Sequence, residues 1–160
     1  MRHILAMTLA VLLSAGAAGA QDFDAGLEAY QRGDYASAMK EWHPLAEAGN
    51  PHIQFFIGGM YDLGQGVPQD NGEAVHWYRL SANQGIAKAQ VSLGNMYYYG
   101  EGVSKDFVEA HKRFNMGCAL GEQLGCDNRN FVSSILPPAD ISEAQRRARV
   151  CMESNFRDCD

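Results

Sequence analysis

A serine and a lysine in the N-terminal third of the chain have the spacing of a known catalytic pair. Ser37 is followed three residues later by Lys40, in the string Ser37-Ala38-Met39-Lys40. Ser-x-x-Lys is the serine-nucleophile signature of enzymes that act on β-lactams, but their companion strings Ser-Asp-Asn and Lys-Thr-Gly are absent from this sequence. A β-lactam-binding protein or β-lactamase-like hydrolase is therefore the alternative function, and an ordinary helix explains this string better.

The other residues that could act as bases or metal ligands form no such pattern. The histidines His43, His52, His76 and His111 are dispersed, with neither a second histidine four residues on nor the glutamate of a metallohydrolase. A single histidine on an amphipathic helix more often lies at the surface or in a helix seam than in a catalytic site. We therefore predict no catalytic residue, no metal site and no cofactor, and expect a protein that is not an enzyme.

All four cysteines lie in the last 43 residues, at Cys118, Cys126, Cys151 and Cys159. They lack the Cys-x-x-Cys spacing of zinc sites, and an even number in an exported chain predicts two disulfides. Eight residues of straight helix span about 12 Å, which is farther than a disulfide reaches, so a bond between neighbours requires a turn. Gly121 supplies one between the first two cysteines. We favour the local bonds Cys118–Cys126 and Cys151–Cys159 over crossed pairing.

The first 20 residues have the layout of a secretory signal peptide. Arg2 supplies a positive start, residues 4–13 an apolar run, and Ala18-Gly19-Ala20 a small-x-small cleavage site. The run is shorter than the roughly 20 residues that a permanent membrane helix needs. We expect cleavage after Ala20, a periplasmic or secreted protein without stable membrane insertion, and one domain over residues 21–160.

The charge of the chain argues against a nucleic-acid partner. There are 13 basic and 19 acidic residues, for a net charge of −6. The nearest approach to a basic stretch is Arg146-Arg147-Ala148-Arg149, which Glu143 precedes by three residues, as on a solvated helix face. Nothing in the sequence would supply the counterion release that drives binding to nucleic acid.

An internal repeat of 36 residues occupies the middle of the chain. Eleven residues recur unchanged 36 positions later. They are Gly49, Gln54, Gly58, Met60, Tyr61, Gly64, Gly66, Val67, Asp70, Glu73 and Ala74. A fixed period of this length is typical of stacked units that cannot bury their apolar faces alone. We predict an all-α protein, an α/α superhelical solenoid of helix-turn-helix repeats. Its units are about 21–48, 49–84 and 85–120, with a degenerate C-terminal cap at 121–160.

Each copy of the repeat predicts two helices joined by a glycine-rich turn. We expect first helices at 51–63 and 87–99, second helices at 71–84 and 107–120, a related upstream pair at 25–32 and 35–48, and C-terminal helices at 122–134 and around 141–152. In the turns, Gly64 and Gly100 allow left-handed backbone. Asp70 and Asp106 are placed to cap the helices that follow.

The two copies of the first helix differ on one face and agree on the other. Positions 54, 57, 58, 60 and 61 are identical or similar and share one face, whereas positions 55, 56, 59, 62 and 63 differ and lie opposite. We expect the matched face to be the packing seam, where Gly58 and Gly94 let a neighbouring helix approach closely. The differing face should point outward.

These residues resemble a known repeat. The pattern Gln-x-x-Leu/Ile-Gly-x-Met-Tyr-x-x-Gly-x-Gly-Val-x-x-Asp-x-x-x-Ala, at 54–74 and 90–110, is similar to the Sel1-like repeat (SLR), a relative of the tetratricopeptide repeat. The closing run at 141–146 looks like the tail of exported bacterial members. The resemblance implies a scaffold or adaptor that binds other proteins, with the outward face lining the concave side.

Two departures from the repeat pattern affect these expectations. Arg113 stands where the first copy has Trp77, which should weaken one packing anchor of the second helix. Cys118 and Cys126 resemble the paired cysteines of a cysteine-rich bacterial branch that has been linked to penicillin binding and β-lactamase activity. The resemblance to that branch is the second reason for the alternative function given above.

Six outward-facing residues are the candidate contacts for a protein partner of unknown identity: Phe55, Phe56, Asp62, Ser92, Asn95 and Tyr98. Phe56 and Tyr98 are the strongest candidates, because each is a large aromatic where the other copy carries a small or polar residue, and aromatics are enriched among binding anchors. A second interpretation of Phe56 stays open, in which its ring packs beneath the N-terminal helical pair.

Overall fold

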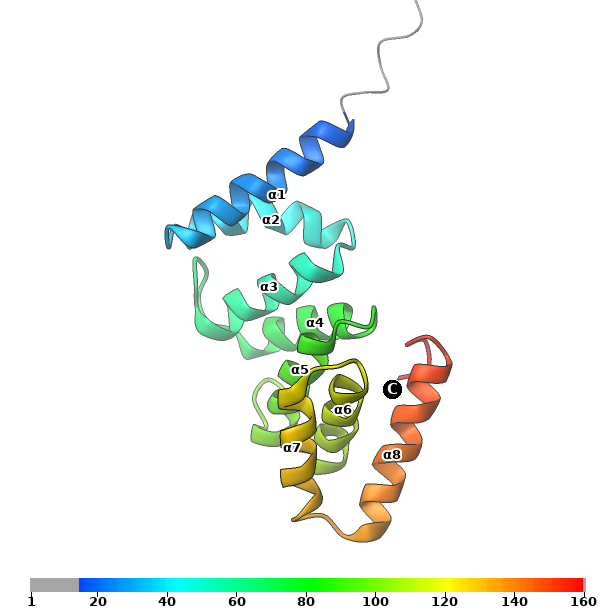
Figure 1. The fold of residues 1–160 in the computed structure, drawn as a ribbon. Coiled ribbons are helices and arrows are strands. Elements are labelled where there is room, and N and C mark those ends of the chain that lie inside the picture. The colour runs from blue at the N-terminus through cyan, green and yellow to red at the C-terminus, as the bar shows by residue number, and fades with distance from the viewer. Residues whose placement is uncertain (1–14, 160) are drawn as a thin grey trace, which may run out of the picture.

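The described part of the chain, residues 15–159, consists of helices joined by turns, and its side chains are described from residue 23 onward (Figure 1). In this computed structural model the helices are α1 (Ala15–Gln31), α2 (Tyr35–Glu47), α3 (Pro51–Leu63), α4 (Asn71–Ala82), α5 (Ala87–Tyr99), α6 (Phe107–Ala119), α7 (Gln123–Ser133) and α8 (Pro138–Glu153). From α1 to α7, each helix packs on the next. The predicted all-α solenoid is confirmed.

The first helix differs from its prediction. It begins at Ala15, although the sequence predicted a helix over 25–32 only. Most of the predicted signal peptide, residues 1–14, lies outside the described residues, and its last six residues belong to α1. Because residues 15–26 contain many alanines and no proline, the helix can extend through them. Within residues 15–159, no helix combines the length and apolar character needed to cross a membrane.

The predicted packing seam is formed by the matched residues of the repeat. A Cβ atom at Gly58 would lie 2.6 Å from the ring of Tyr78, and one at Gly94 the same distance from the ring of Phe114. The absence of a side chain therefore lets each second helix approach its first helix. The buried Gln54 and Gln90 donate their amides to the carbonyls of Ala46 and Ala82, at 3.0 and 2.8 Å. These bonds join each unit to the preceding one.

The turns follow the expected chemistry in both copies. Gly64 and Gly100 end their helices in the left-handed region, with φ of 65° and 78°. The Asp70 carboxylate accepts from the amides of Gly72 and Glu73 at 2.9 and 3.0 Å, and Asp106 caps α6 in the same way. These caps satisfy amides that the first turn of a helix leaves without partners.

The C-terminal helix departs from the regular stacking. In the two regular units the second helix packs on its own first helix, α4 on α3 and α6 on α5, whereas α8 packs on α6. Figure 1 shows α7 and α8 on opposite sides of α6. Ala148 and Cys151 of α8 form a buried cluster with Met116 of α6. This arrangement leaves much of α7 open to solvent.

Both favoured disulfides are formed. Cys118 and Cys126 join the end of α6 to the start of α7 across the turn at Gly121, which has a φ of 95°. Cys151 and Cys159 are joined because α8 ends at Glu153 and the chain then reverses. The reversal uses left-handed backbone at Asn155 and Phe156, with φ of 56° and 63°.

Candidate functional site

A row of three shallow hollows follows the first helices of successive units. The hollow between α3 and α5 measures about 480 Å³, and the next two, toward α7, measure about 240 and 230 Å³. Neighbouring hollows share lining residues, because Phe55, Lys88 and Glu122 border the first two and Asn95 borders the last two. The hollows therefore form one continuous surface, which we call the first-helix groove.

Five of the six predicted contact residues line the first-helix groove. Phe55 and Phe56 border its α3 end, Ser92 and Asn95 its centre, and Tyr98 its α7 end. All five are partly exposed. The structure thus brings these residues onto one surface.

The sixth predicted residue, Asp62, lies outside the groove lining and supports the seam instead. Its carboxylate accepts a hydrogen bond from the hydroxyl of Tyr78 at 3.1 Å, and its backbone carbonyl accepts one from the side-chain amide of Gln69 at 2.8 Å. Burial of the ring, followed by the nearby negative charge of Asp62, raises the pKa of the Tyr78 phenol. The contact that Asp62 makes in this structure is therefore structural.

Phe56 adopts the packing interpretation that the sequence left open. Its ring centroid lies 5.2 Å from that of Trp42 and 6.0 Å from that of Tyr30, within the core beneath α1 and α2. Phe55, its neighbour, faces Tyr78 at 5.9 Å and borders two of the hollows. Phe56 is therefore a core residue with one edge on the groove.

The α7 end of the groove carries two largely exposed aromatic side chains, and an exposed leucine borders the neighbouring central hollow. Phe131 and Tyr99 are 57% and 61% exposed, and Leu124 is 52% exposed. The partly buried Tyr98 ring lies 6.0 Å from Phe131 and 5.3 Å from Phe107, measured between ring centroids. Unpaired apolar surface of this kind marks a contact site more often than single scattered residues do.

Two amides cross the groove at the same end. The Asn128 side-chain amide donates to the Asn95 carbonyl at 3.3 Å, which joins α7 to α5. Within the described part of the chain, the Asn95 amide group and the Asn128 carbonyl oxygen have no further hydrogen-bond partner. Both can therefore meet a polar group that enters the hollow.

Sequence comparison of the two copies missed the contribution of α7. Leu124, Asn128 and Phe131 follow Lys88, Ser92 and Asn95 by 36 residues each, but the α7 segment has lost the glycine and tyrosine of the pattern. Extending the 36-residue period beyond residue 121, without requiring identical residues, could have identified them. This signal is weak because it rests on position alone.

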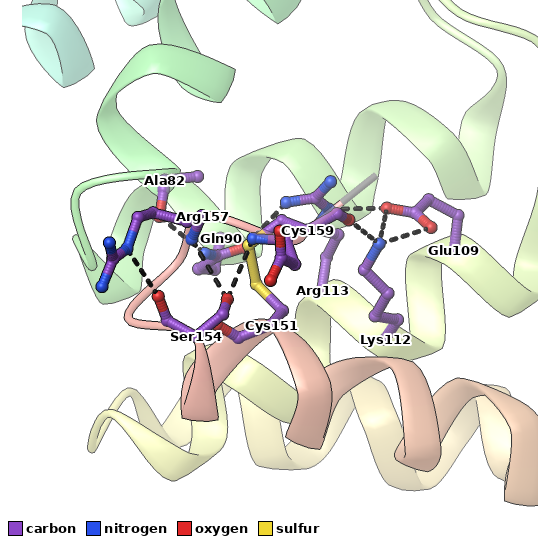
Figure 2. Close-up of a disulfide and its surroundings, with 10 residues drawn as sticks. Ala82, Gln90, Glu109, Lys112, Arg113, Cys151, Ser154, Arg157 and Cys159 are labelled. Carbon is purple, nitrogen blue, oxygen red and sulfur yellow. Dashed lines mark hydrogen bonds and ion pairs between the residues drawn. A yellow bond between two sulfur atoms is a disulfide. The ribbon is translucent and has the colours of Figure 1, made fainter.

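A buried charged cluster occupies the junction of α6 and α8 (Figure 2). Arg113 is fully buried, and its Nε donates to the Glu109 carboxylate at 2.7 Å while its Nη1 lies 3.5 Å from the Gln90 carbonyl oxygen. Lys112 lies 2.9 Å from the same carboxylate and donates to the backbone carbonyl of Cys159. The position of Trp77 in the first copy is therefore filled in the second by an ion-paired arginine.

His111 is a buried residue of the seam between α6 and α7. Its Nε2 lies 2.8 Å from the hydroxyl of Ser133, which donates to the backbone carbonyl of Arg129 at 2.8 Å. Burial, and then the positive charge of Arg129, lower the pKa of His111, so the ring is neutral at pH 7. Because the serine hydroxyl is committed to a helix carbonyl, this pair does not have the geometry of an activated nucleophile.

Ser37 and Lys40 are exposed residues of α2. The Ser37 backbone amide is capped by the Asp34 carboxylate at 3.2 Å, and Ala38 is fully buried like its counterparts Ala74 and Ala110. Among the described residues, no hydrogen bond joins the Ser37 hydroxyl to Lys40. The string is explained by helix capping and packing.

Comparisons with known proteins agree with this arrangement. The family model of the Sel1 repeat matches residues 51–86 and 87–122. A solved protective antigen of uropathogenic Escherichia coli, which has an SLR fold, is 27% identical with a TM-score of 0.80, over 86% of this chain and 31% of that one. A Sel1 repeat protein from Oxalobacter formigenes is 34% identical with a TM-score of 0.66, over 69% of this chain and 45% of that one. No curated protein matches the sequence.

The chain therefore spans about a third of the first solved structure and less than half of the second. The repeats found by the family model coincide with the helical pairs α3–α4 and α5–α6. Together, the repeat match, the two solved structures and the shared helical architecture place this chain in the Sel1-like repeat family.

Proposed function

We propose that this protein is an exported scaffold that binds a segment of a partner protein in the first-helix groove. The observation that carries the proposal is the continuity of the groove across α3, α5 and α7, with exposed Tyr99 and Phe131 at the α7 end and exposed Leu124 at the centre. Stacked helical repeats generally use such extended surfaces for protein contacts. Exposed aromatic side chains that lie beside amides with free hydrogen-bonding capacity are suited to anchor a partner.

Export is the second part of the proposal. Two disulfides are formed within residues 15–159, and disulfides persist in oxidising compartments. The signal-peptide layout of residues 1–20 points to the same location, with residues 21–160 as the mature domain. We place the mature protein in the periplasm or outside the cell.

Site-specific photocrosslinking in the native compartment tests the binding surface. A photoreactive amino acid at Tyr99 should crosslink to a defined partner, whereas the same group at Leu80, which is 37% exposed on α4 outside the groove lining, should not. Phe131→Ser should abolish the crosslink at Tyr99 while leaving the melting temperature unchanged. A crosslink that forms equally from both positions, or that survives Phe131→Ser, would contradict the proposal.

A further inference from the structure

The two disulfides close loops of equal length but lie in different surroundings. In each bond the cysteines are eight residues apart. Cys151 and Cys159 are buried, with exposed fractions of 0% and 4%. Cys118 and Cys126 are both partly exposed at the turn between α6 and α7. Only the Cys118–Cys126 bond is therefore open to a reagent that approaches the folded protein.

An arginine lies directly against the exposed bond. The Nη1 of Arg129 donates to the Sγ of Cys118 at 3.3 Å and to the Asn115 carbonyl oxygen at 3.4 Å. Its Nε and Nη2 donate to the Asn130 side chain at 3.2 and 3.0 Å. Among the described residues these partners are neutral, so no carboxylate there offsets the guanidinium charge. That charge would stabilise a thiolate on Cys118.

The helix ends act on the two sulfurs in opposite ways. Cys126 lies in the first turn of α7, where the helix dipole favours an anion. Cys118 lies in the last turn of α6, where the dipole disfavours one. The full charge of Arg129 at 3.3 Å outweighs the partial charge of the α6 end, which is spread over a turn. Both sulfurs are thus held where a thiolate is stabilised.

We propose that the Cys118–Cys126 disulfide is a thiol-exchange site, open to attack by thiolates while the protein remains folded. This inference is independent of partner binding in the groove. In the first step a thiolate attacks the Sγ of Cys126, a new S–S bond forms, and the bond to Cys118 breaks. The electron pair of the broken bond stays on the Cys118 sulfur, beside the Arg129 guanidinium.

A second thiolate completes the exchange. It attacks the reagent sulfur of the mixed disulfide, releases Cys126 as a thiolate, and leaves as part of an oxidised disulfide. In total two thiols are oxidised, and the protein gains two electrons and two protons. The reductant is a free thiol, supplied either by a low-molecular-mass compound or by a dithiol protein.

The fold around the site has other contacts that hold α7 in place. A Cβ atom at Gly125 would lie 2.8 Å from the backbone nitrogen of Cys118, so the backbones of α6 and α7 approach closely there. The bond between His111 and Ser133 joins the same two helices about two turns farther along. We therefore expect the reduced protein to stay folded, which makes the exchange reversible.

The test compares the two bonds within one folded sample. Purified protein is treated with glutathione or, in a separate arm, with thioredoxin, the free thiols are alkylated, and the labelled cysteines are identified by peptide mass spectrometry. Label should appear on Cys118 and Cys126 in native buffer, and on Cys151 and Cys159 only after denaturant is added. Faster reaction with glutathione identifies a small thiol as the source, and faster reaction with thioredoxin a dithiol protein.

Variants of Arg129 distinguish the effect of its charge on the exchange rate from the effect of the exposure of the disulfide. Arg129→Gln should slow opening of the exposed bond about tenfold, because the leaving thiolate loses its adjacent charge, and Arg129→Lys should restore most of the rate. Asn115→Ala, which removes a neutral partner of Arg129 and keeps its charge, is the control and should react like the wild type. Equal rates for both bonds in wild-type protein, reaction with neither thiol, or an unchanged rate in a folded Arg129→Gln variant would overturn the proposal.

Discussion

The ring of Tyr78 lies directly against the backbone of Gly58. Two of its carbons would lie 2.6 and 2.8 Å from a Cβ atom at that glycine, so a methyl group has no room there. The same relationship recurs 36 residues later between Phe114 and Gly94. The glycine and the aromatic ring thus form the repeated contact that joins the first and second helices of a unit.

Substitution of the seam glycine should be strongly destabilising. Gly58→Ala should lower the free energy of unfolding by about 1–3 kcal/mol, because the ring or the helix must move to admit the methyl group. The adjacent Gly59 is the control, since a Cβ atom there would lie at an ordinary 3.6 Å from the Tyr78 hydroxyl. Gly59→Ala should stabilise the helix by up to about 1 kcal/mol. Guanidinium unfolding of both variants measures the difference, and equal effects would argue against the seam.

Phe56 and Phe131 should separate stability from binding. Phe56→Ser should lower the free energy of unfolding by about 1–3 kcal/mol, because its ring packs on Trp42 and Tyr30. Phe131→Ser should change it by no more than about 0.5 kcal/mol, because that ring is 57% exposed. Thermal and guanidinium unfolding check both. A destabilised Phe131→Ser variant would show that this ring belongs to the core.

The stability of the protein should fall between about pH 6.5 and 5. Burial lowers the pKa of His111 in the folded state, so the unfolded chain binds more protons than the folded protein as the pH falls below 6.5. The stabilisation from a neutral His111 is thus complete when the pH is above the pKa of this histidine in the unfolded chain. It is lost as the pH falls from there through the lower pKa that His111 has in the folded protein. Carboxylates titrate mostly below this range.

The His111→Gln variant measures how much of this loss of stability at low pH is due to the histidine. His111→Gln keeps a polar side chain that can reach Ser133 and has no proton to gain, so its unfolding free energy should decrease less over the same pH range. Urea unfolding at pH 7.5, 6.5 and 5.5 measures both proteins. Parallel curves for wild type and variant would assign the pH dependence to other groups.

Removing either disulfide should lower the free energy of unfolding, but by different amounts. Each closes a loop of the same size, for which the chain-entropy model gives about 2–3 kcal/mol. Replacing Cys151 and Cys159 by alanine should cost more than replacing Cys118 and Cys126, because the first pair is buried and positions the carbonyl that Lys112 binds. Guanidinium unfolding of the two double variants compares them. A larger loss for the exposed pair would contradict this assignment.

Local chemistry explains why the repeat was predictable. The bounds of α3 and α5 agree with the predicted 51–63 and 87–99, and Asp70 and Gly64 act as the cap and the left-handed turn that their residue types suggested. Helix periodicity, capping and turns depend on residues a few positions apart, so two aligned copies of the sequence contain the information.

The C-terminal part shows where that information ends. The sequence indicated a packing anchor weakened at Arg113, whereas the structure buries this arginine against Glu109 and Gln90. The sequence predicted a helix around 141–152, but it did not show that α8 packs on α6 and leaves Phe131 open. These outcomes depend on packing between helices that are far apart in the sequence.

By itself, then, the sequence determined the helices, their turns, the two favoured cysteine pairs and the outward face of the repeat. Only the tertiary structure decided that Phe56 supports the core, that Asp62 binds Tyr78, and that α7 completes the groove. The physical reason is that helix formation is settled by near neighbours along the chain. The role of an exposed-face side chain is settled by packing between units, where small shifts decide which side chains stay in contact with solvent.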